Sequence, residues 1–302
     1  MRKYIFLAGR ANPALAKEIA TELGICEGAV ALKRFPDGET AVQLLESVRQ
    51  QWVFLLQPTS PPVNENLLEL LTLVDACRRA GAERIIAIVP YFGYSRSDKR
   101  HGRWEPITAS MVAELLQVVG VAQLITFDLH ASQIEGFFHI PVDSLTAVPI
   151  LYQALAKQLP ADVVVVSPDT GRVMMASQYA QLLHTEVVVL HKQRISGTET
   201  EVTQVVGEVR SRPCLIVDDM ISTGGTIAKS VKALLEAGAA PEIYVAATHG
   251  LFVGKARNQL GHDSIKALWI TNTISPPASN WPQLQVVSVA PLIADAIEQL
   301  TK

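Results

Sequence analysis

The sequence predicts an α/β fold made of two similar domains, each with a mostly parallel central sheet flanked by helices. Two observations lead to this prediction. Short runs of β-branched and other apolar residues alternate with longer amphipathic runs, which is the pattern of alternating strands and helices. Several of the short runs are apolar on both faces, as are the strands of a parallel sheet covered by helices.

The apolar runs predict strands at residues 4–7, 53–56, 84–89, 124–128, 163–167, 187–191, 215–219, 243–248 and 265–270. The amphipathic runs predict helices at residues 13–23, 63–80, 108–120, 149–158, 171–182, 226–237 and 291–300. Asn12 followed by Pro13 is a typical helix start, and Gly24, Gly81 and Gly238 are typical helix stops. Residues 267–294 carry no charge but contain four prolines and many polar residues, so we expect a strand, a loop and a strand there rather than a membrane helix.

The length of 302 residues corresponds to about two domains at roughly 150 residues per domain. The two halves follow the same outline of strand, helix, strand and polar loop, which places the boundary near residue 145. We therefore expect an N-terminal domain at residues 1–145 and a C-terminal domain at residues 146–302. No low-complexity linker separates them in the sequence, which predicts that the domains pack closely.

Charge and cysteine content narrow the classes of function. The net charge of −3 argues against a protein that coats nucleic acid, because such proteins usually carry a basic surplus. Cys26, Cys77 and Cys214 are far apart and form no C-x-x-C motif, which excludes a disulfide scaffold and a zinc–thiolate site and fits a reducing cytosol. The apolar run after Met1 is too short for a secretory signal, so we expect a cytoplasmic protein that binds neither nucleic acid nor membrane.

The most informative segment is residues 214–226, where a predicted buried strand ends in two carboxylates and a polar, glycine-containing loop leads into a helix. The N–H groups at a helix N-terminus suit phosphate, and the carboxylates can accept hydrogen bonds from sugar hydroxyls or hold a cation. These features together suit a phosphorylated sugar; the alternative is an ordinary strand-to-helix turn with an Asp cap. The Walker A and G-x-G-x-x-G motifs are absent from the sequence. The candidate sugar-phosphate residues are Asp218, Asp219, Ser222, Thr223, Gly224, Gly225 and Thr226.

This segment resembles the phosphoribosyl-pyrophosphate loop of type I phosphoribosyltransferases. Other segments resemble the ribose-phosphate diphosphokinase (phosphoribosyl pyrophosphate synthetase) family, and they occur in the family's order from about residue 8 to residue 294. They are residues 35–39 (FPDGE), 58–66 (PTSPPVNEN), 90–98 (PYFGYSRSD), 105–108 (EPIT), 128–130 (DLH) with 133–138 (QIEGFF), and 167–169 (SPD). The resemblance implies two type I phosphoribosyltransferase-like domains and a reaction in which the β,γ-diphosphoryl group of ATP moves to the anomeric hydroxyl of ribose 5-phosphate. AMP leaves, and Mg²⁺ is required.

The resemblance also implies roles for individual residues. ATP is bound by Phe35, Asp37, Gly38, Glu39, Arg96, Ser97, Asp98, Lys99 and His130. Lys192 and Arg194 are the catalytic cations at the root of a polar flap at residues 195–201, and Arg194 also contacts ribose 5-phosphate. His130 and Asp169 are the positions associated with the metal, where one carboxylate and the substrate phosphates suffice. Taken without the resemblance, residues 35–39 also fit a surface turn, residues 96–99 and 192–194 also fit charged loops, and His130 also fits a capping or core residue.

Two other functions stay open. A phosphoribosyltransferase shares the loop at residues 218–226 but does not need the nucleotide segments at 35–39 and 96–99. A catalytically silent regulatory partner of a synthetase typically has altered flap or metal positions, whereas the cations and metal-associated residues named above are all present. Three positions depart from the family pattern: Ser97 replaces the usual Gln, Arg172 replaces a common Gly, and Ser222 replaces the Asp of many members. Arg172 would add a phosphate contact or face solvent.

Finally, the resemblance implies a homo-oligomer, built from dimers or hexameric, in which residues 35–39 serve the ATP site of a neighbouring subunit. Many relatives continue past the last helix into a tail that helps form a regulatory site for phosphate and ADP, whereas this sequence ends at Lys302. Ser47, Arg49 and Arg79 match positions near that site. The expectation is weak or absent allosteric inhibition by ADP.

Overall fold

The computed structural model describes residues 3–100, 102–194, 200–278 and 280–302, without the side chains of residues 192–194 and 200–203. The chain forms two compact units. Unit 1 contains Met1–Thr146, Thr273–Ser275 and Ser288–Lys302, and unit 2 contains Ala147–Asn272 and Pro276–Val287. The first change of unit lies next to the expected boundary at residue 145, whereas the C-terminal helix belongs to unit 1. The division into functional domains at residue 145 stays a prediction.

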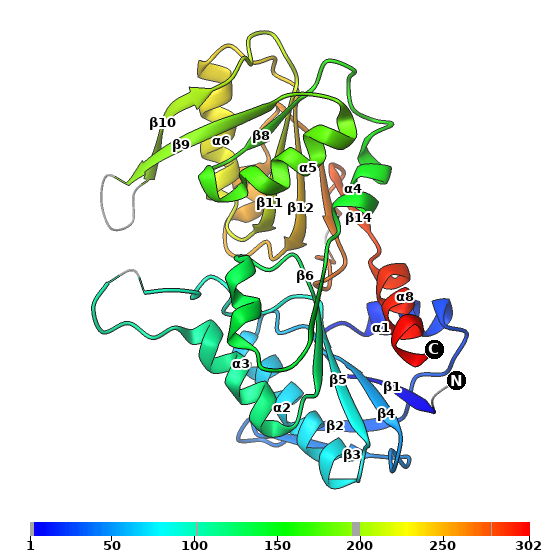
Figure 1. Cartoon of the computed structure of the whole chain (residues 1–302). Helices are drawn as coiled ribbons and strands as arrows, with labels where there is room; N and C mark the ends of the chain where they lie inside the picture. The colour runs from blue at the N-terminus through cyan, green and yellow to red at the C-terminus, as the bar shows by residue number, and fades with distance from the viewer. Residues whose placement is uncertain (1–2, 101, 195–199, 279) are drawn as a thin grey trace. The chain divides into compact units, whose positions relative to one another are not determined.

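Unit 1 is built on a parallel sheet with the strand order β1-β4-β5-β6-β7 (Figure 1). The strands are β1 (Tyr4–Ala8), β4 (Trp52–Leu56), β5 (Arg84–Val89), β6 (Gln123–Phe127) and β7 (Val142–Leu145). A separate antiparallel hairpin pairs β2 (Val30–Arg34) with β3 (Thr40–Leu44). The helices are α1 (Pro13–Glu22), α2 (Val63–Arg79), α3 (Thr108–Val119) and α8 (Ala290–Thr301), and a 3-10 turn covers Ser132–Phe137.

The core of unit 1 explains why these segments fold as they do. On one face of the sheet, alternate strand residues such as Leu7 and Leu55 pack against the apolar stripes of α2 and α3, which include Leu70 and Leu116. Helix α1 starts where the sequence predicts, because the Asn12 side chain accepts a hydrogen bond from the Leu15 N–H at 3.2 Å. Helix α8 packs against α1, which explains its place in unit 1 although it is far away in sequence.

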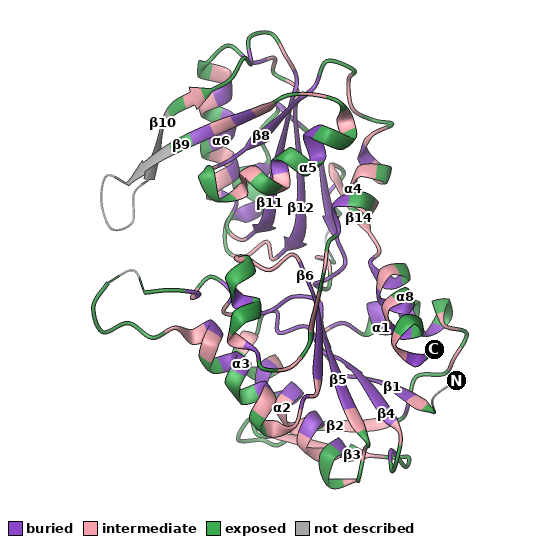
Figure 2. Ribbon diagram, viewed as in Figure 1, coloured by how far each residue is buried: buried purple, intermediate pink, exposed green. Residues whose placement is uncertain are grey.

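Unit 2 is built on a seven-stranded sheet with the order β10-β9-β8-β11-β12-β13-β14, parallel except for the antiparallel β10–β9 pair. The strands are β8 (Val164–Ser167), β9 (Val187–Arg194), β10 (Thr200–Val206), β11 (Cys214–Ile221), β12 (Ile243–Gly250), β13 (Ile265–Thr271) and β14 (Leu284–Val287). The helices are α4 (Val148–Leu155), α5 (Val173–Leu183), α6 (Gly225–Glu236) and α7 (Ala256–Leu260), and a 3-10 turn covers Thr170–Arg172. Figure 2 shows buried strands flanked by helices with one exposed face.

The two-domain α/β fold with mostly parallel sheets is therefore confirmed, and every expected strand and helix is present with ends shifted by at most a few residues. The stretch at residues 267–294 contains β13, a loop and β14, as expected. Strands β2, β3, β7 and β10 were not predicted, because they are short or polar and do not carry the continuous apolar pattern of the buried strands. In the described parts of the chain, no helix combines the length and apolarity needed to cross a membrane.

Candidate functional site

The main candidate site lies in unit 2, between β8 and β11, where the order in which the chain adds strands to the sheet reverses. From β8 the chain first adds β9 on one side and later β11 on the other. In open α/β sheets, ligands bind at such a switch point, beyond the carboxyl ends of the strands. The pairing of β8 with β11 ends at Val166 and Ile216, whereas β11 continues to Ile221. The last residues of β11 therefore extend beyond β8 at the edge where ligands are expected.

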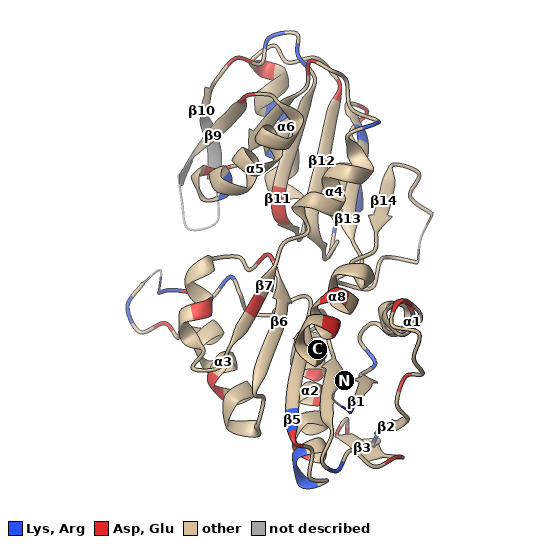
Figure 3. Ribbon diagram, turned by 45° about the vertical axis from the view of Figure 1, so that its right-hand side comes forward, with Lys and Arg blue, Asp and Glu red and all other residues tan. Residues whose placement is uncertain are grey.

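Asp218 and Asp219 lie on this extension of β11, inside the strand rather than after it (Figure 3). Their side chains are only 10% and 2% exposed, and the Asp219 N–H donates to Asp218 Oδ1 at 2.9 Å. The Nε of Arg172 lies 3.4 Å from Asp218 Oδ1 and 3.2 Å from Asp219 Oδ1. Arg172 thus does not simply face solvent but pairs with both carboxylates, and the phosphate contact that was its other expected role stays a prediction. This contact leaves no local pattern in the sequence, because Arg172 and the two carboxylates are far apart along the chain.

The electrostatics of this acidic pair follow from burial and from like charge. Burial raises the pKa of Asp218 well above its ordinary value, and the adjacent Asp219 raises it further. Arg172 opposes this rise, while Asp169 adds to it. The pair is therefore short of positive charge, which favours ligands that donate hydrogen bonds or bring a cation.

The loop after β11 leads into α6 with the geometry of a phosphate site. Gly224 is the N-cap residue with φ +81°, and a Cβ there would lie 3.1 Å from Leu260 Cγ and 3.3 Å from the Ala256 carbonyl oxygen. Glycine is therefore required both by the left-handed backbone and by the close approach of α7. The first N–H groups of α6, starting at Gly225, have no acceptor within the helix, as at any helix N-terminus. Ser222, Thr223 and Thr226 add hydroxyls beside them.

Asp169 follows β8 and begins the short turn that carries Arg172. Its side chain accepts a hydrogen bond from the Gly171 N–H at 3.0 Å, and its carbonyl accepts one from Ser167 Oγ at 2.7 Å. In the described residues, no three His, Cys, Asp or Glu side chains gather closely enough to hold a metal ion by themselves. A magnesium ion near Asp169 would therefore take most of its ligands from substrate phosphates and water, as this ion commonly does.

Lys192 and Arg194 lie at the end of β9, the strand next to β8. Their side chains, and residues 195–199 of the predicted flap, are outside the described part of the structure. Strands β9 and β10 pair antiparallel from Arg194 with Thr200 to Val189 with Val206, and together they form a two-stranded ribbon. Lys192 and Arg194 therefore lie at the carboxyl end of β9, and β9 is the neighbour of β8 in the sheet.

In unit 1, residues 35–39 form the tip of the β2–β3 hairpin. The Phe35 N–H donates to the Glu39 carbonyl at 2.8 Å, and the Gly38 N–H donates to the Phe35 carbonyl at 2.9 Å. Gly38 has φ +96°, which explains its place in this tight connection. The Phe35 ring is 52% exposed, and Asp37 and Glu39 are exposed as well. The segment is a surface turn by local structure, and it presents an aromatic ring and two carboxylates to solvent.

The loop at residues 96–99 is anchored at Ser97 and Asp98 and exposed at Arg96 and Lys99. Arg96 and Lys99 are exposed, whereas Asp98 is buried and accepts a hydrogen bond from Gln133 Nε2 at 3.2 Å. Ser97 is used through its backbone, because its N–H donates to the Tyr94 carbonyl and its carbonyl accepts from the Ala109 N–H. Asp98 is thus held by its own unit, while the two cations remain accessible to a ligand.

Two neighbouring residues at the start of α2 connect the hairpin to this loop. Glu65 forms an ion pair with Arg34 at the end of β2, and Asn64 accepts a hydrogen bond from the Tyr94 hydroxyl. Gln133 also links the loop to the turn that follows His130. His130 is half-buried and comes two residues after Asp128, whose φ is +32°, just beyond the end of β6. The structure therefore ties the candidate nucleotide segments of unit 1 to one another; sequence reasoning did not identify Asn64, Glu65 or Gln133 as the links.

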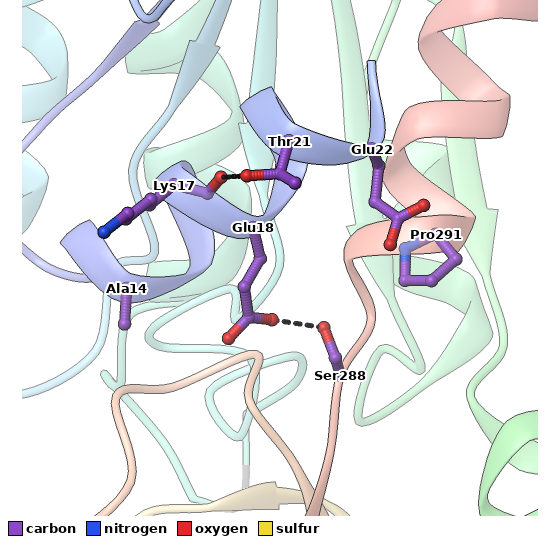
Figure 4. Close-up of a pocket in the computed structure, with 7 residues that line it drawn as sticks. All are labelled: Ala14, Lys17, Glu18, Thr21, Glu22, Ser288 and Pro291. Carbon is purple, nitrogen blue, oxygen red and sulfur yellow. Dashed lines mark hydrogen bonds between the residues drawn. The ribbon is translucent and has the colours of Figure 1, made fainter. Parts of the chain in front are cut away.

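A further pocket of about 420 Å³ lies elsewhere in unit 1, between α1 and the start of α8 (Figure 4). Glu18 and Glu22 line it together with Lys17, and Ser288 Oγ donates to Glu18 at 2.5 Å. It contains none of the candidate site residues, so it is separate from the nucleotide segments and the acidic pair.

Comparison with known proteins places the chain in a family. Residues 4–120 match the family described as the N-terminal domain of ribose phosphate pyrophosphokinase, and residues 142–281 match the phosphoribosyl transferase domain family. A ribose-phosphate pyrophosphokinase from Gloeobacter violaceus is 44% identical over 292 residues, which is 96% of this chain and 88% of the relative. One from Thermotoga maritima is 43% identical over 299 residues, covering 98% of this chain and 94% of the relative. The crystal structure of phosphoribosylpyrophosphate synthetase from Mycobacterium smegmatis has a TM-score of 0.92 and 40% identity, and the match covers 99% of both chains.

Proposed function

The chain belongs to the ribose-phosphate pyrophosphokinase family, and we propose which of its residues carry out the reaction. The enzyme makes 5-phosphoribosyl 1-pyrophosphate, a precursor for nucleotide biosynthesis, from ribose 5-phosphate and ATP. The anomeric hydroxyl of ribose 5-phosphate attacks the β-phosphorus of ATP, the bond between the α- and β-phosphates breaks, and AMP leaves. The matches along both halves of the chain favour this activity over that of a phosphoribosyltransferase.

Ribose 5-phosphate binds at the switch point of unit 2 in this proposal. Asp218 and Asp219 accept hydrogen bonds from the ring hydroxyls, and the 5-phosphate lies against the N-terminus of α6, with Ser222, Thr223, Gly224, Gly225 and Thr226 around it. The observation that carries the assignment is that a buried acidic pair and an open helix N-terminus stand on the same short stretch of chain. Ser222 leaves the site with one carboxylate fewer than in many relatives, and a hydroxyl there still offers a hydrogen bond to the phosphate.

Lys192 and Arg194 stabilise the charge that develops on the diphosphoryl group during transfer. Phosphoryl transfer needs little covalent chemistry from the protein, so preorganised cations supply much of the rate enhancement. The pairing of β9 with β8 ends at Val189 and Ser167, so the end of β9 extends beyond the carboxyl end of β8, at the edge of the sheet that carries the proposed sugar site. Arg194 also contacts ribose 5-phosphate in this proposal, and the flap at residues 195–201 limits hydrolysis of ATP by excluding water.

ATP is bound by Phe35, Asp37, Gly38, Glu39, Arg96, Ser97, Asp98, Lys99 and His130. The exposure of Phe35 at a hairpin tip supports a role between subunits, where the ring and the neighbouring carboxylates meet the adenine of an adjacent copy. Arg96 and Lys99, exposed next to the anchored Asp98, suit the polyphosphate. Ser97 contributes mainly by holding the loop through its backbone. The enzyme is accordingly a homo-oligomer, built from dimers or hexameric, with shared ATP sites.

Mg²⁺ is the proposed cofactor, and it would neutralise the phosphate oxygens and orient them for in-line attack. Asp169 fits this ion because a carboxylate is a hard oxygen ligand and lies on the turn after β8. His130 is a less suitable direct ligand for magnesium, so its role is on the triphosphate next to the ion. We also place the enzyme in the cytoplasm, which the three free cysteines support.

The direct test incubates the protein with Mg²⁺, ATP and ribose 5-phosphate and identifies the adenine product. We expect AMP in a one-to-one ratio with 5-phosphoribosyl 1-pyrophosphate. ADP as the main product would show an ordinary kinase and contradict the proposal. No turnover of adenine nucleotide would instead support the catalytically silent partner.

A further inference from the structure

Arg172 lies next to Asp218 and Asp219 of the proposed sugar site. The residue ends the 3-10 turn that begins after β8, and its side chain is only 13% exposed. Its Nε lies within 3.4 Å of a carboxylate oxygen of Asp218 and within 3.2 Å of one of Asp219. One guanidinium therefore contacts two carboxylates that are adjacent on the same strand.

Two adjacent buried carboxylates cannot easily stay ionised and close together without a counter-charge. Their mutual repulsion and the loss of hydration both disfavour the ionised pair. Without Arg172 the side chains would separate or take up a proton, and either change removes acceptor oxygens at the positions where a sugar hydroxyl would bind. A planar guanidinium is well suited to hold such a pair, because its N–H groups are fixed in direction and always charged.

The backbone that carries Arg172 is itself held in place. Gly171 N–H donates to the Asp169 side chain, Arg172 N–H donates to the Asp169 carbonyl at 3.4 Å, and Ser167 Oγ donates to the same carbonyl at 2.7 Å. The turn therefore fixes the start of the Arg172 side chain relative to β8. Because β8 and β11 are paired neighbours, the turn also fixes Arg172 relative to the acidic pair.

We propose that Arg172 is a positioning residue for ribose 5-phosphate, which holds Asp218 and Asp219 as a preformed pair of acceptors for the sugar hydroxyls. This inference rests on the proposed function. Arg172 acts through the two carboxylates and contributes no proton or bond to the reaction. Its loss therefore affects the use of ribose 5-phosphate and leaves the use of ATP nearly unchanged.

The test compares Arg172→Gln and Arg172→Lys with the wild type in steady-state kinetics, with folding checked by circular dichroism. For Arg172→Gln we expect the KM for ribose 5-phosphate to rise roughly tenfold or more, because Asp218 and Asp219 are no longer held as acceptors for the sugar hydroxyls. The KM for ATP should change less than about twofold, since the nucleotide segments are untouched. Arg172→Lys should recover part of the loss, because an ammonium keeps the charge but not the fork of donors.

A double-mutant cycle keeps the inference testable even if Arg172→Gln alone folds poorly. In the Asp218→Asn background one carboxylate is gone, so removal of Arg172 leaves no like-charge pair and the folded protein should be retained. The effect of Arg172→Gln on the KM for ribose 5-phosphate should then be clearly smaller than in the wild type. A merely structural arginine would give additive effects, and additivity would overturn the inference.

Arg212→Gln is the matched control, because Arg212 precedes β11 and pairs with Glu186 at 3.1 Å, away from the acidic pair. This variant should keep the wild-type KM for ribose 5-phosphate. If the wild type produces AMP but Arg172→Gln has an unchanged KM for ribose 5-phosphate, the positioning role is wrong and the proposed function stands. If the wild type produces no AMP, the proposed function fails, and the inference fails with it.

Discussion

The carboxyl ends of β1 and β4 in unit 1 and of β8 and β11 in unit 2 are corresponding positions with different chemistry. In both units an arginine follows the first of these strands and pairs with an acid. In unit 1, Arg10 Nε donates to Glu69 Oε2 at 2.6 Å, and the Arg10 N–H donates to Glu69 Oε1 at 2.7 Å. Gln57, which follows β4, donates to Glu69 Oε1 at 3.0 Å. Both carboxylate oxygens of Glu69 are therefore used by donors of the same unit.

The helices that follow β4 and β11, α2 and α6, also differ at their N-termini. Helix α2 is preceded by Pro61 and Pro62, which have no N–H to offer, whereas α6 begins at Gly224 and Gly225. The arginine–acid pair alone therefore does not make a substrate site. Unit 2 combines acceptors at the strand end with a glycine-led helix N-terminus, and this combination is why we propose the sugar-phosphate site there and not in unit 1.

The largest expected effect concerns the β9–β10 ribbon, which has no counterpart in unit 1, because among the described residues no strand pairs with the free side of β1. Lys192→Ala should lower kcat by ~10²–10³, the usual loss when one preorganised donor to the transition state is removed. The KM for ribose 5-phosphate should change much less. A loss of activity below about threefold would mean that Lys192 is only a surface residue and that the ribbon is not catalytic.

An acid-to-amide substitution should have different effects in the two units. Glu69→Gln should lower the free energy of unfolding by about 2–4 kcal/mol, because it removes the buried charge that pairs with Arg10 and replaces one acceptor oxygen by an NH2 group that faces existing donors. The kinetic constants of the folded fraction should remain near wild type. Denaturant unfolding and steady-state kinetics measure the two quantities, and a selective rise in the KM for ribose 5-phosphate would contradict a purely structural network.

The reactivity of two buried cysteines can show which unit is destabilised by Glu69→Gln. Cys77 lies in the core of unit 1 and Cys214 in the core of unit 2, and burial raises the pKa of each thiol to about 12. Both should be protected from a thiol reagent in the folded protein, whereas the exposed Cys26 reacts. In Glu69→Gln, Cys77 should become reactive at a lower denaturant concentration than in the wild type. A shift seen at Cys214 alone would show that the network does not stabilise unit 1.

Asp219→Asn is the corresponding change in unit 2. Asn keeps the volume but replaces one acceptor oxygen by a donor, so a sugar hydroxyl loses its partner at a cost of about 1–3 kcal/mol. The kinetic efficiency with ribose 5-phosphate should fall accordingly, with little change in the midpoint of unfolding. Wild-type values of both KM and kcat for ribose 5-phosphate would remove Asp219 from the sugar site.

The smallest expected effect is the pH dependence of the contribution that Arg172 makes to the free energy of unfolding. Because the pKa of Asp218 is raised in the folded protein, the folded state binds this proton more tightly than the unfolded chain. The stability from this group is thus fully present in acid, below the unfolded pKa of about 3.9, and is lost as the pH rises through the folded value. Removal of Arg172 raises that pKa further. The difference in the free energy of unfolding between wild type and Arg172→Gln should therefore grow as the pH rises from acid. A difference that shrinks with pH would contradict this.

Much of the fold and the chemical parts of the site could be predicted from the sequence. Continuous apolar runs identified the buried strands, and the pattern at residues 214–226 identified the acidic pair and the glycine-containing loop that leads into α6. Local signals suffice there because the strand, the loop and the helix start are contiguous in the chain. The hairpin strands β2 and β3 were missed because they are not fully buried and their apolar residues are interrupted or followed by polar or charged ones.

What could not be predicted depends on contacts between distant residues. The pairing of Arg172 with Asp218 joins residues that are brought together only when β8 and β11 become neighbours. The place of α8 in unit 1 likewise depends on its packing against α1. Neither contact leaves a periodic or local pattern in the sequence.

The most direct test of the central claim, that ribose 5-phosphate binds at the β8–β11 end of unit 2, is backbone NMR of the protein with ¹⁵N-labelled glycine. Ribose 5-phosphate is titrated in the presence of Mg²⁺ and α,β-methylene ATP, which blocks the bond that the reaction breaks. The amide signals of Gly224 and Gly225, at the start of α6, should shift with the sugar phosphate, while that of Gly9, which follows β1, should not. Shifts at Gly9 with unchanged signals from Gly224 and Gly225 would contradict the account.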